Sequence, residues 1–218
     1  WIDQVPAVLE AWYGGQEAGN SIADILFGKV NPSGKLTATF AKELNDYACH
    51  AKGTYPGKLG PLSADPHTNY TEGIFIGYRW FDQQKITPRF PFGHGLSYTS
   101  FEIKNNGVEL LSKSLNKPKV QVKVEISNTG KRTGAEVIQL YVRDKQSSVL
   151  RPKKELKAFQ KVFLKPSESK IITLDLDFRS FAFWSENDKN WKIEKGDFEI
   201  IIATSATDIK YSQNIRLE

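Results

Sequence analysis

The second half of the chain alternates apolar and polar residues with a period of two, the pattern of a β-strand with one buried face. Valine or isoleucine occupies every second position from 120 to 126, and Asn128-Thr129-Gly130 supplies a turn after this run. Further strand-like segments cover residues 136–142, 170–176, 198–202 and 209–215. About seven short strands, spaced about ten residues apart, predict a two-sheet antiparallel sandwich of immunoglobulin type from residue 101 onward.

Helix and strand signals alternate in the first part of the chain. Residues 7–12 (AVLEAW) are a short apolar run, and residues 36–40 (LTATF) are alternating and β-branched, so both segments are predicted as strands. Between them, helical spacing from Ile22 to Phe27 predicts a helix that stops at Gly28. Strand, helix and strand form a βαβ-type unit, which needs partner strands that the chain does not obviously contain.

Residues 70–100, here called the connecting segment, are rich in aromatic residues and glycines. Aromatic side chains bury large areas and glycines allow turns that other residues avoid, so a buried and specifically folded connection is predicted. Within it, the ring of His94 is predicted to hydrogen-bond inside the segment rather than to contact a ligand. Arg79 and Glu72 are predicted to form a buried ion pair.

Composition excludes several classes of protein. The chain has 218 residues, 39% hydrophobic and 25% charged, and no apolar run approaches the roughly 20 residues that span a bilayer. The net charge of +5 comes from scattered lysines without a basic stripe, so neither nucleic acid nor membrane is an expected partner. One cysteine, Cys49, excludes an intrachain disulfide framework. Three histidines make a zinc site unusual, and no metal is predicted.

Several motifs resemble, in order and spacing, the C-terminal portion of glycoside hydrolase family 3, the family of β-glucosidases and β-xylosidases. Residues 12–40 (WYGGQEAGNSIADILFGKVNPSGKLTATF) are similar to the end of its α/β sandwich domain. Residues 72–82 (EGIFIGYRWFD) and 90–101 (FPFGHGLSYTSF) are similar to the segment that leaves this domain. Those similar to its fibronectin type III-like domain are residues 124–142, 151–162, 179–184 and 191–200. The resemblance covers essentially the whole chain.

The resemblance implies a fold of two kinds: an α/β fragment, which is an incomplete α/β sandwich unit, followed by an all-β, fibronectin type III-like antiparallel sandwich. The expected division is residues 1–69 for the α/β piece with its loop, residues 70–100 for the connecting segment and residues 101–218 for the β-sandwich. The chain opens with WIDQVPAVLEAW, which reads as mid-domain sequence, so a piece of a larger protein is expected.

The family's chemistry is retaining hydrolysis of terminal β-linked sugars, which requires two carboxylates about 5–5.5 Å apart and no cofactor. Family members carry the nucleophilic aspartate on an N-terminal (β/α)8 barrel and the acid/base glutamate upstream of the WYGGQEAG-like segment. Neither position is matched here, so the chain alone is expected to be inactive. Its expected partners are the missing barrel, the rest of the α/β sandwich domain and, in the intact enzyme, a β-glucoside or oligosaccharide. A periplasmic or secreted location is favoured over the cytoplasm.

Gln16 and Glu17 are the candidate substrate-binding residues. They follow a predicted strand, where ligands gather in open α/β sheets, and they would line the cleft of the intact enzyme only. The structural alternative has both residues capping the following helix, because a carboxylate suits a helix N-terminus. No catalytic residue is assigned to this chain.

Trp184 and Trp191 allow two interpretations. They resemble core anchors of the sandwich domain, but exposed tryptophans could also stack on sugar rings. The second interpretation supports an alternative function for the chain, a non-catalytic carbohydrate-binding or protein-interaction module that acts alone.

Overall fold

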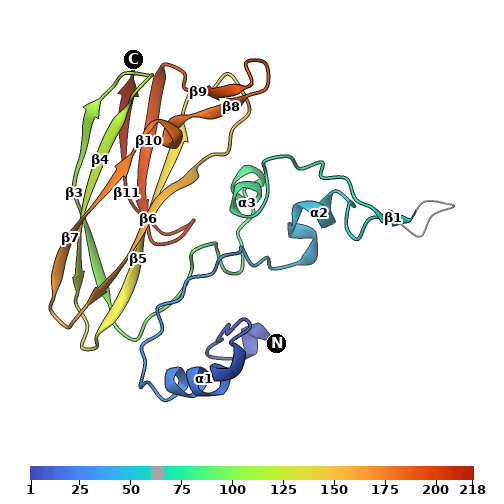
Figure 1. Cartoon of the computed structure of the whole chain (residues 1–218). Helices are drawn as coiled ribbons and strands as arrows, with labels where there is room; N and C mark the ends of the chain where they lie inside the picture. The colour runs from blue at the N-terminus through green and yellow to red at the C-terminus, as the bar shows by residue number, and fades with distance from the viewer. Residues whose placement is uncertain (60–65) are drawn as a thin grey trace.

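Residues 101–218 fold into a two-sheet antiparallel β-sandwich (Figure 1). The computed structural model describes residues 1–59 and 66–218. The sandwich strands are β3 (Phe101–Ser112), β4 (Lys119–Asn128), β5 (Gly134–Asp144), β6 (Glu155–Leu164), β7 (Ser169–Leu176), β10 (Gly196–Ala203) and β11 (Ile209–Leu217). One sheet has the order β11-β10-β5-β6 and the other the order β3-β4-β7. The predicted immunoglobulin-type sandwich is therefore confirmed.

The period of two in the sequence builds the core between the two sheets. The apolar residues at positions 120, 122, 124 and 126 of β4 are fully buried. They belong to one core cluster with Ile138 and Leu140 of β5, which are equally buried. Burying one such side chain contributes about 1.5–3 kcal/mol, so this layer dominates the stability of the sandwich. Phe181 and Phe198 add an edge-to-face ring pair with centroids 5.3 Å apart. Phe181 belongs to α4 (Phe178–Phe181), which precedes a small hairpin of β8 (Phe183–Ser185) and β9 (Asn190–Lys192).

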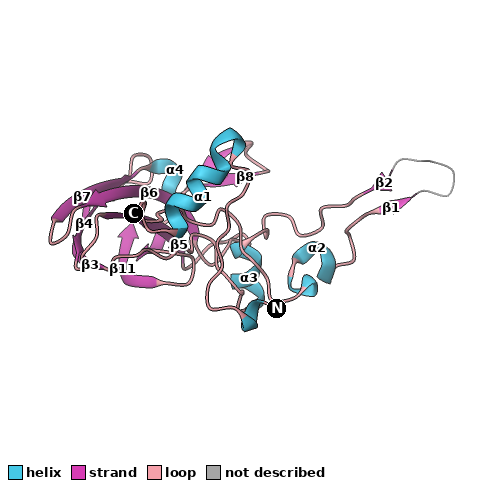
Figure 2. Cartoon of the chain, turned by 90° about the horizontal axis from the view of Figure 1, so that it is seen from below, coloured by secondary structure: helices cyan, strands magenta, loops and turns pink. Residues whose placement is uncertain are grey.

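The first hundred residues contain short, widely spaced elements. These are the 3-10 helices η1 (Ile2–Gln4), η2 (Gly15–Glu17) and η3 (Leu44–Asp46), the helices α1 (Ala18–Leu26), α2 (Ala48–Ala51) and α3 (Tyr78–Gln84), and the strands β1 (Lys58–Leu59) and β2 (Pro66–His67). Figures 1 and 2 show α2 and the β1–β2 hairpin projecting away from the sandwich. The predicted helix is present as α1, and Gly28 follows it with a positive φ of 70°. None of the helices in the described ranges is long and apolar enough to cross a membrane.

The two strands predicted around α1 are wrong for this structure. Residues 7–12 form no strand, and residues 36–40 form only an isolated bridge between Phe40 and Phe90. The backbone N–H of Leu36 also donates to the carbonyl oxygen of His94 at 2.8 Å. A strand requires a neighbouring strand for its backbone hydrogen bonds. In the described part of the chain, the backbone-to-backbone hydrogen bonds of residues 36–40 go to residues 89–94 of the connecting segment, which form no strand there. The α/β part is thus incomplete, as its sequence predicted.

The connecting segment packs on the outer face of the four-stranded sheet. Its helix α3 starts after Gly77, which has a φ of +53°, and ends at Lys85 in the left-handed conformation. The ring of Tyr78 lies 5.7 Å from the ring of Tyr141 on β5 and 5.2 Å from that of Phe92. These side chains form a second apolar cluster outside the sandwich core. The connecting segment is therefore a layer that covers part of the sheet. Its predicted burial holds only in part, because Phe81 is buried whereas Tyr70 and Leu96 are 82% and 78% exposed.

Candidate functional site

The predicted substrate-binding residues lie at the start of α1. Gln16 and Glu17 are both exposed, and a Glu17 carboxylate oxygen accepts a hydrogen bond from Asn20 Nδ2 at 2.6 Å. Glu17 occupies the position that caps α1, but its side chain makes no capping hydrogen bond to the backbone. The carboxylate therefore sits beside the helix N-terminus, where the helix dipole favours negative charge. Its place in a substrate cleft remains a prediction.

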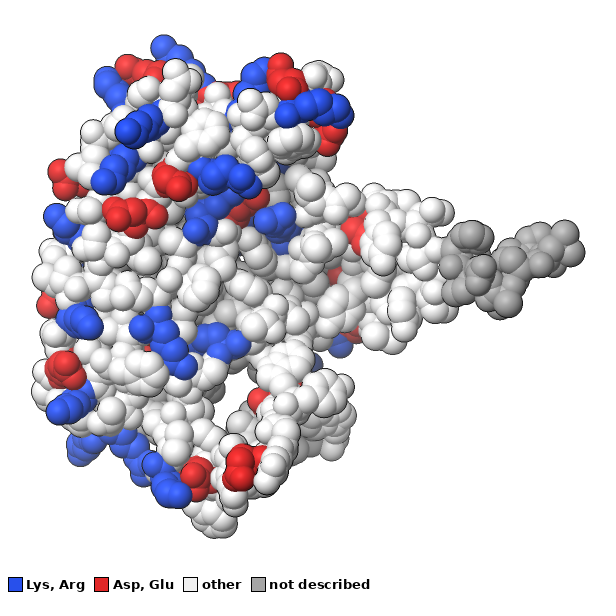
Figure 3. Space-filling model, in the orientation of Figure 1, with Lys and Arg blue, Asp and Glu red and all other residues white. Residues whose placement is uncertain are grey.

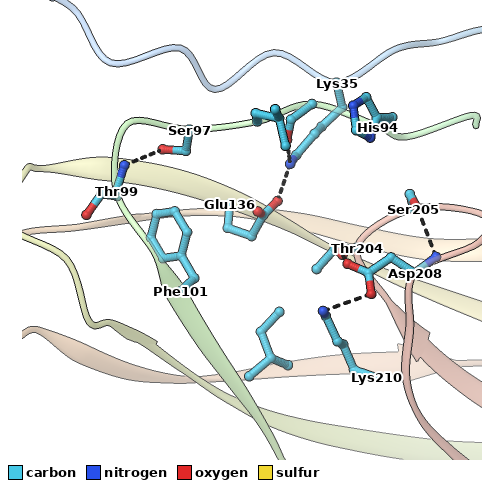
Figure 4. A pocket seen from close by; sticks show the side chains of 13 residues that line it. Lys35, His94, Ser97, Thr99, Phe101, Glu136, Thr204, Ser205, Asp208 and Lys210 are labelled. Carbon is cyan, nitrogen blue, oxygen red and sulfur yellow. Dashed lines mark hydrogen bonds and ion pairs between the residues drawn. The ribbon is translucent and has the colours of Figure 1, made fainter. Parts of the chain in front are cut away.

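A cavity of about 290 Å³ lies at the end of the sandwich, where the connecting segment meets it (Figure 4). This junction cavity is lined by three parts of the chain: Lys35, residues 94–97 and 99 of the connecting segment, and residues of β3, β5, β11 and the β10–β11 loop. It exists only because the connecting segment folds back on the sandwich. No local motif in the sequence predicts this cavity.

A buried ion pair forms the floor of the junction cavity. Lys35 Nζ lies 2.6 Å from Glu136 Oε1, and each side chain is only 12% exposed. Lys35 also donates to the carbonyl oxygen of Gly95 at 2.6 Å, while Glu136 Oε1 accepts the backbone N–H of Val137 at 2.7 Å. Removing one partner of such a pair leaves an uncompensated buried charge. The pair therefore ties residue 35 to strand β5.

A second ion pair stands at the more exposed side of the cavity. Lys210 Nζ lies 2.8 Å from Asp208 Oδ1, and Thr204 Oγ1 donates to Asp208 Oδ2 at 2.5 Å. Burial raises the pKa of Asp208, but the hydrogen bonds from Lys210 and Thr204 outweigh it, and the net pKa lies below the ordinary value. Asp208 is therefore ionised at neutral pH.

His94 lies beside the floor pair with its ring stacked on Phe90, at a centroid distance of 5.5 Å. Burial, and secondly the charge of Lys35, lower the pKa of His94. The imidazole is therefore neutral at pH 7. The ring hydrogen bond predicted from sequence is not among the hydrogen bonds of the described residues, and stacking holds the ring instead.

The connecting segment is also joined to the sandwich by a network of charged side chains, here called the ionic seam. It consists of Arg79 and Asp82 on α3, and Asp144, Arg151, Lys154, Glu155 and Lys157 on the sandwich. Arg151 is 7% exposed and bonds Asp144 at 3.2 Å and Glu155 at 2.9 Å. Lys154 reaches across to Asp82 at 2.5 Å.

The predicted pair of Arg79 with Glu72 is wrong. Arg79 Nη2 lies 3.3 Å from Glu155 Oε1, because α3 turns this side chain toward the sandwich. Glu72 is buried on its own, and its Oε2 has no hydrogen-bond partner within the described residues. The pairing of Arg79 is thus a contact between the connecting segment and β6 rather than one within the connecting segment.

The ionic seam predicts a pH-dependent stability. Burial raises the pKa of Glu155, but Lys157 and Arg151 outweigh it, so the folded pKa lies below the ordinary value. Its stabilising effect is present above the unfolded pKa of about 4.3 and is lost as pH falls through the folded pKa. Glu155→Gln is therefore expected to be less stable than the native chain at pH 7, and the difference should shrink by pH 3, as measured by urea unfolding. Glu109→Gln, in an exposed pair with Lys123, should change stability by less than about 0.5 kcal/mol at both pH values. A difference for Glu155→Gln that is the same at pH 7 and pH 3 would contradict this assignment.

The two tryptophans differ in their surroundings. Trp191 packs against the sandwich core, and the guanidinium of Arg179 lies 3.5 Å from its ring centroid. Trp184 pairs edge-to-face with Trp191 at 5.7 Å but remains 43% exposed. The core interpretation is confirmed for Trp191, whereas Trp184 keeps an accessible surface.

Comparison with known proteins agrees with both halves of the fold. Residues 1–78 match the glycosyl hydrolase family 3 C-terminal domain, and residues 136–206 match the fibronectin type III-like domain. The chain therefore belongs to glycoside hydrolase family 3 and corresponds to the C-terminal portion of its members.

Individual relatives agree over the whole chain. It is 46% identical to thermostable beta-glucosidase B of Acetivibrio thermocellus and 41% identical to an exo-alpha-(1->6)-L-arabinopyranosidase of Bifidobacterium breve; each alignment covers 100% of this chain and 28% or 27% of the relative. The structure superposes on the beta-glucosidase from Kluyveromyces marxianus in complex with glucose with a TM-score of 0.90 and 35% identity, covering 100% of this chain and 25% of that one. The chain thus spans about a quarter of the length of the relatives that it matches.

Proposed function

We propose that this chain is the C-terminal part of a retaining β-glycosidase, most closely a β-glucosidase, that hydrolyses terminal non-reducing β-linked sugars. In this proposal the chain is structural and contributes neither catalytic carboxylate. The observation that carries the proposal is similarity to β-glucosidases along the entire chain, at 46% identity in one case. The proposed division is the α/β piece at residues 1–69, the connecting segment at residues 70–100 and the sandwich at residues 101–218.

The apolar side chains exposed in the first hundred residues support the proposal that this part of the chain docks on a partner. Large apolar side chains there lie open to solvent; among them are Trp1, Trp12, Tyr13, Leu26, Phe27 and Tyr70. Figure 3 shows charged residues spread over the sandwich, whereas the projecting part is mostly uncharged on this face. Many large apolar side chains exposed on one part of a chain favour an interaction site there. The partner we propose is the barrel and the remaining α/β sandwich domain of the same protein.

A charge placed on this surface should weaken the docking. Phe27 is 89% exposed at the end of α1, so Phe27→Asp is expected to reduce co-purification with the separately expressed preceding portion by at least about tenfold, because it buries a charge. The matched control is Ile171, which is 55% exposed on β7 of the three-stranded sheet. Ile171→Asp should not change the yield of the co-purified complex. If both variants lost the complex equally, or if neither variant lost it, this docking surface would be wrong.

Gln16 and Glu17 are proposed to line the substrate cleft of the intact enzyme. A residue that binds ground state and transition state equally affects KM rather than kcat. Glu17→Gln in the intact enzyme is therefore expected to raise KM by about two- to tenfold and to leave kcat within about twofold. Steady-state kinetics on an aryl β-glucoside tests this, with Glu43→Gln as an exposed control. A fall of kcat by about a hundredfold or more would instead indicate general acid–base catalysis by Glu17.

A further inference from the structure

We propose that the junction cavity is a binding site for a neutral polyhydroxylated ligand the size of one sugar ring. This site is separate from the proposed substrate cleft, because the cavity is lined by neither Gln16 nor Glu17 but by Lys35 and by residues of the connecting segment and the sandwich.

The dimensions of the cavity suit a small ligand. Its volume of about 290 Å³ lies at the lower limit of small-molecule sites, which measure about 300–1,000 Å³. The floor pair, Lys35 with Glu136, is almost closed to solvent, whereas the side chains of Asp208 and Lys210 are 52% and 35% exposed. A ligand could therefore enter past the second pair and reach the first.

The charges of the cavity favour a neutral ligand. Its walls carry two ammonium groups and two carboxylates, each ammonium within 2.8 Å of a carboxylate, and the neutral ring of His94 adds no charge. An anion or a cation would have to compete with one of these close pairs. A hydroxyl group would not, since it can donate to a carboxylate oxygen and accept from an ammonium group without separating them.

Hydrogen-bonding capacity remains after these internal contacts. The ammonium of Lys35 has three N–H donors, of which Glu136 and the carbonyl of Gly95 take two. Ser205 Oγ accepts the backbone N–H groups of Thr207 and Asp208, which leaves its own proton to donate. Donors and acceptors are thus both available, as a ring of hydroxyl groups requires.

One wall of the cavity is apolar. The ring of Phe101 and the side chain of Ile103, both on β3, line it, and Figure 4 shows Phe101 across the space from the Asp208–Lys210 pair. A sugar ring has an apolar C–H face and a polar edge of hydroxyls. Such sites combine an apolar wall with a few placed polar groups, which is the arrangement seen here.

The test is titration of the 218-residue chain with D-glucose, followed by saturation-transfer NMR, because any preceding portion would add its own sugar site. Saturable binding with a Kd on the order of 1–10 mM is expected. Glucose 6-phosphate and glucosamine, which carry charges, should bind no more tightly than glucose. Lys210→Met should weaken glucose binding by at least about fivefold, and Lys210→Arg by less. Lys192→Met is the matched control, since Lys192 forms a similar exposed pair with Asp188 at 2.7 Å on the β8–β9 hairpin.

Three results would overturn the site: no saturation up to about 100 mM glucose, tighter binding of a charged sugar, or equal affinity in Lys210→Met and the native chain. Melting temperatures of all variants are measured alongside, and Lys210→Arg keeps the test valid if Lys210→Met unfolds. Because the readout is binding by this chain alone, failure here leaves the proposed β-glycosidase function untouched.

Discussion

Arg151→Met is expected to lower the free energy of unfolding by about 3–5 kcal/mol. The guanidinium bonds two carboxylates, Asp144 and Glu155, whose side chains are 4% and 15% exposed, and also donates to the carbonyl oxygen of Phe181 at 3.0 Å. Methionine keeps much of the side-chain volume but removes the cation that pairs with Asp144, whereas Glu155 keeps Arg79 and Lys157. Urea unfolding of the sandwich, followed by circular dichroism, measures the loss.

The matched control for this change is Arg216→Met. Arg216 pairs with Asp197 at 3.1 Å on the same sheet, but both side chains are substantially exposed. Exposed pairs contribute about 0–1 kcal/mol, so this variant should remain close to the native stability. A loss below about 1 kcal/mol for Arg151→Met would show that the buried pairs of Arg151 with Asp144 and Glu155 do not stabilise the sandwich.

Gly93→Ala is expected to destabilise the junction by about 2–5 kcal/mol, for two reasons that add. Gly93 has a φ of +81°, which costs an L-residue about 1–2 kcal/mol. A Cβ at this position would also collide with the side chain of Gln139, and overpacking costs about 1–3 kcal/mol. Gln139 cannot move freely, because Nε2 donates to the carbonyl oxygen of Thr204 and Oε1 accepts from Tyr141. Thermal and urea unfolding measure the effect.

Two further glycines separate these two causes. A Cβ on Gly95 would meet the carbonyl oxygen of Gly34 without a positive φ, so Gly95→Ala reports the collision alone. Gly73 has a φ of +58° and no atom near its Cβ position, so Gly73→Ala reports the backbone strain alone. The loss in the free energy of unfolding caused by Gly93→Ala should exceed about 2 kcal/mol and should also exceed the loss caused by Gly73→Ala. Equal costs at Gly93 and Gly73 would mean that Gln139 gives way and that the junction is loosely packed.

The sandwich was predictable from sequence because its core lies between sheets, where every second residue is buried. Residues 120–126 read as a strand and are one. Strand β6 was less evident, since it lies at a sheet edge, carries exposed Phe159 and Phe163, and pairs with β5 through a register shift near Leu140. Edge position alone does not explain this, because β7 is also an edge strand and its burial alternates regularly. The burial of β6 alternates only in its second half, so its pattern is weaker.

The first hundred residues were predicted less well, for a physical reason. An apolar run such as residues 7–12 indicates burial, but a strand forms only where another strand offers hydrogen bonds, and the described residues offer none there. Contacts between distant positions escaped prediction as well. Proximity in the sequence favours Glu72 as the partner of Arg79, whereas the fold brings Glu155 to it. The junction cavity likewise joins residues 35 to 210 and has no local sequence signal.

The most direct test of the account is hydrolysis of an aryl β-D-glucoside by the 218-residue chain alone and by the longer protein that contains it. We expect no release of the aryl alcohol above the buffer rate from the chain alone. We expect turnover by the longer protein, because we propose that both catalytic carboxylates lie in its preceding portion. Hydrolysis by the chain alone, sustained through purification and abolished by Glu17→Gln, would contradict the central claim, as would a longer protein without glycosidase activity.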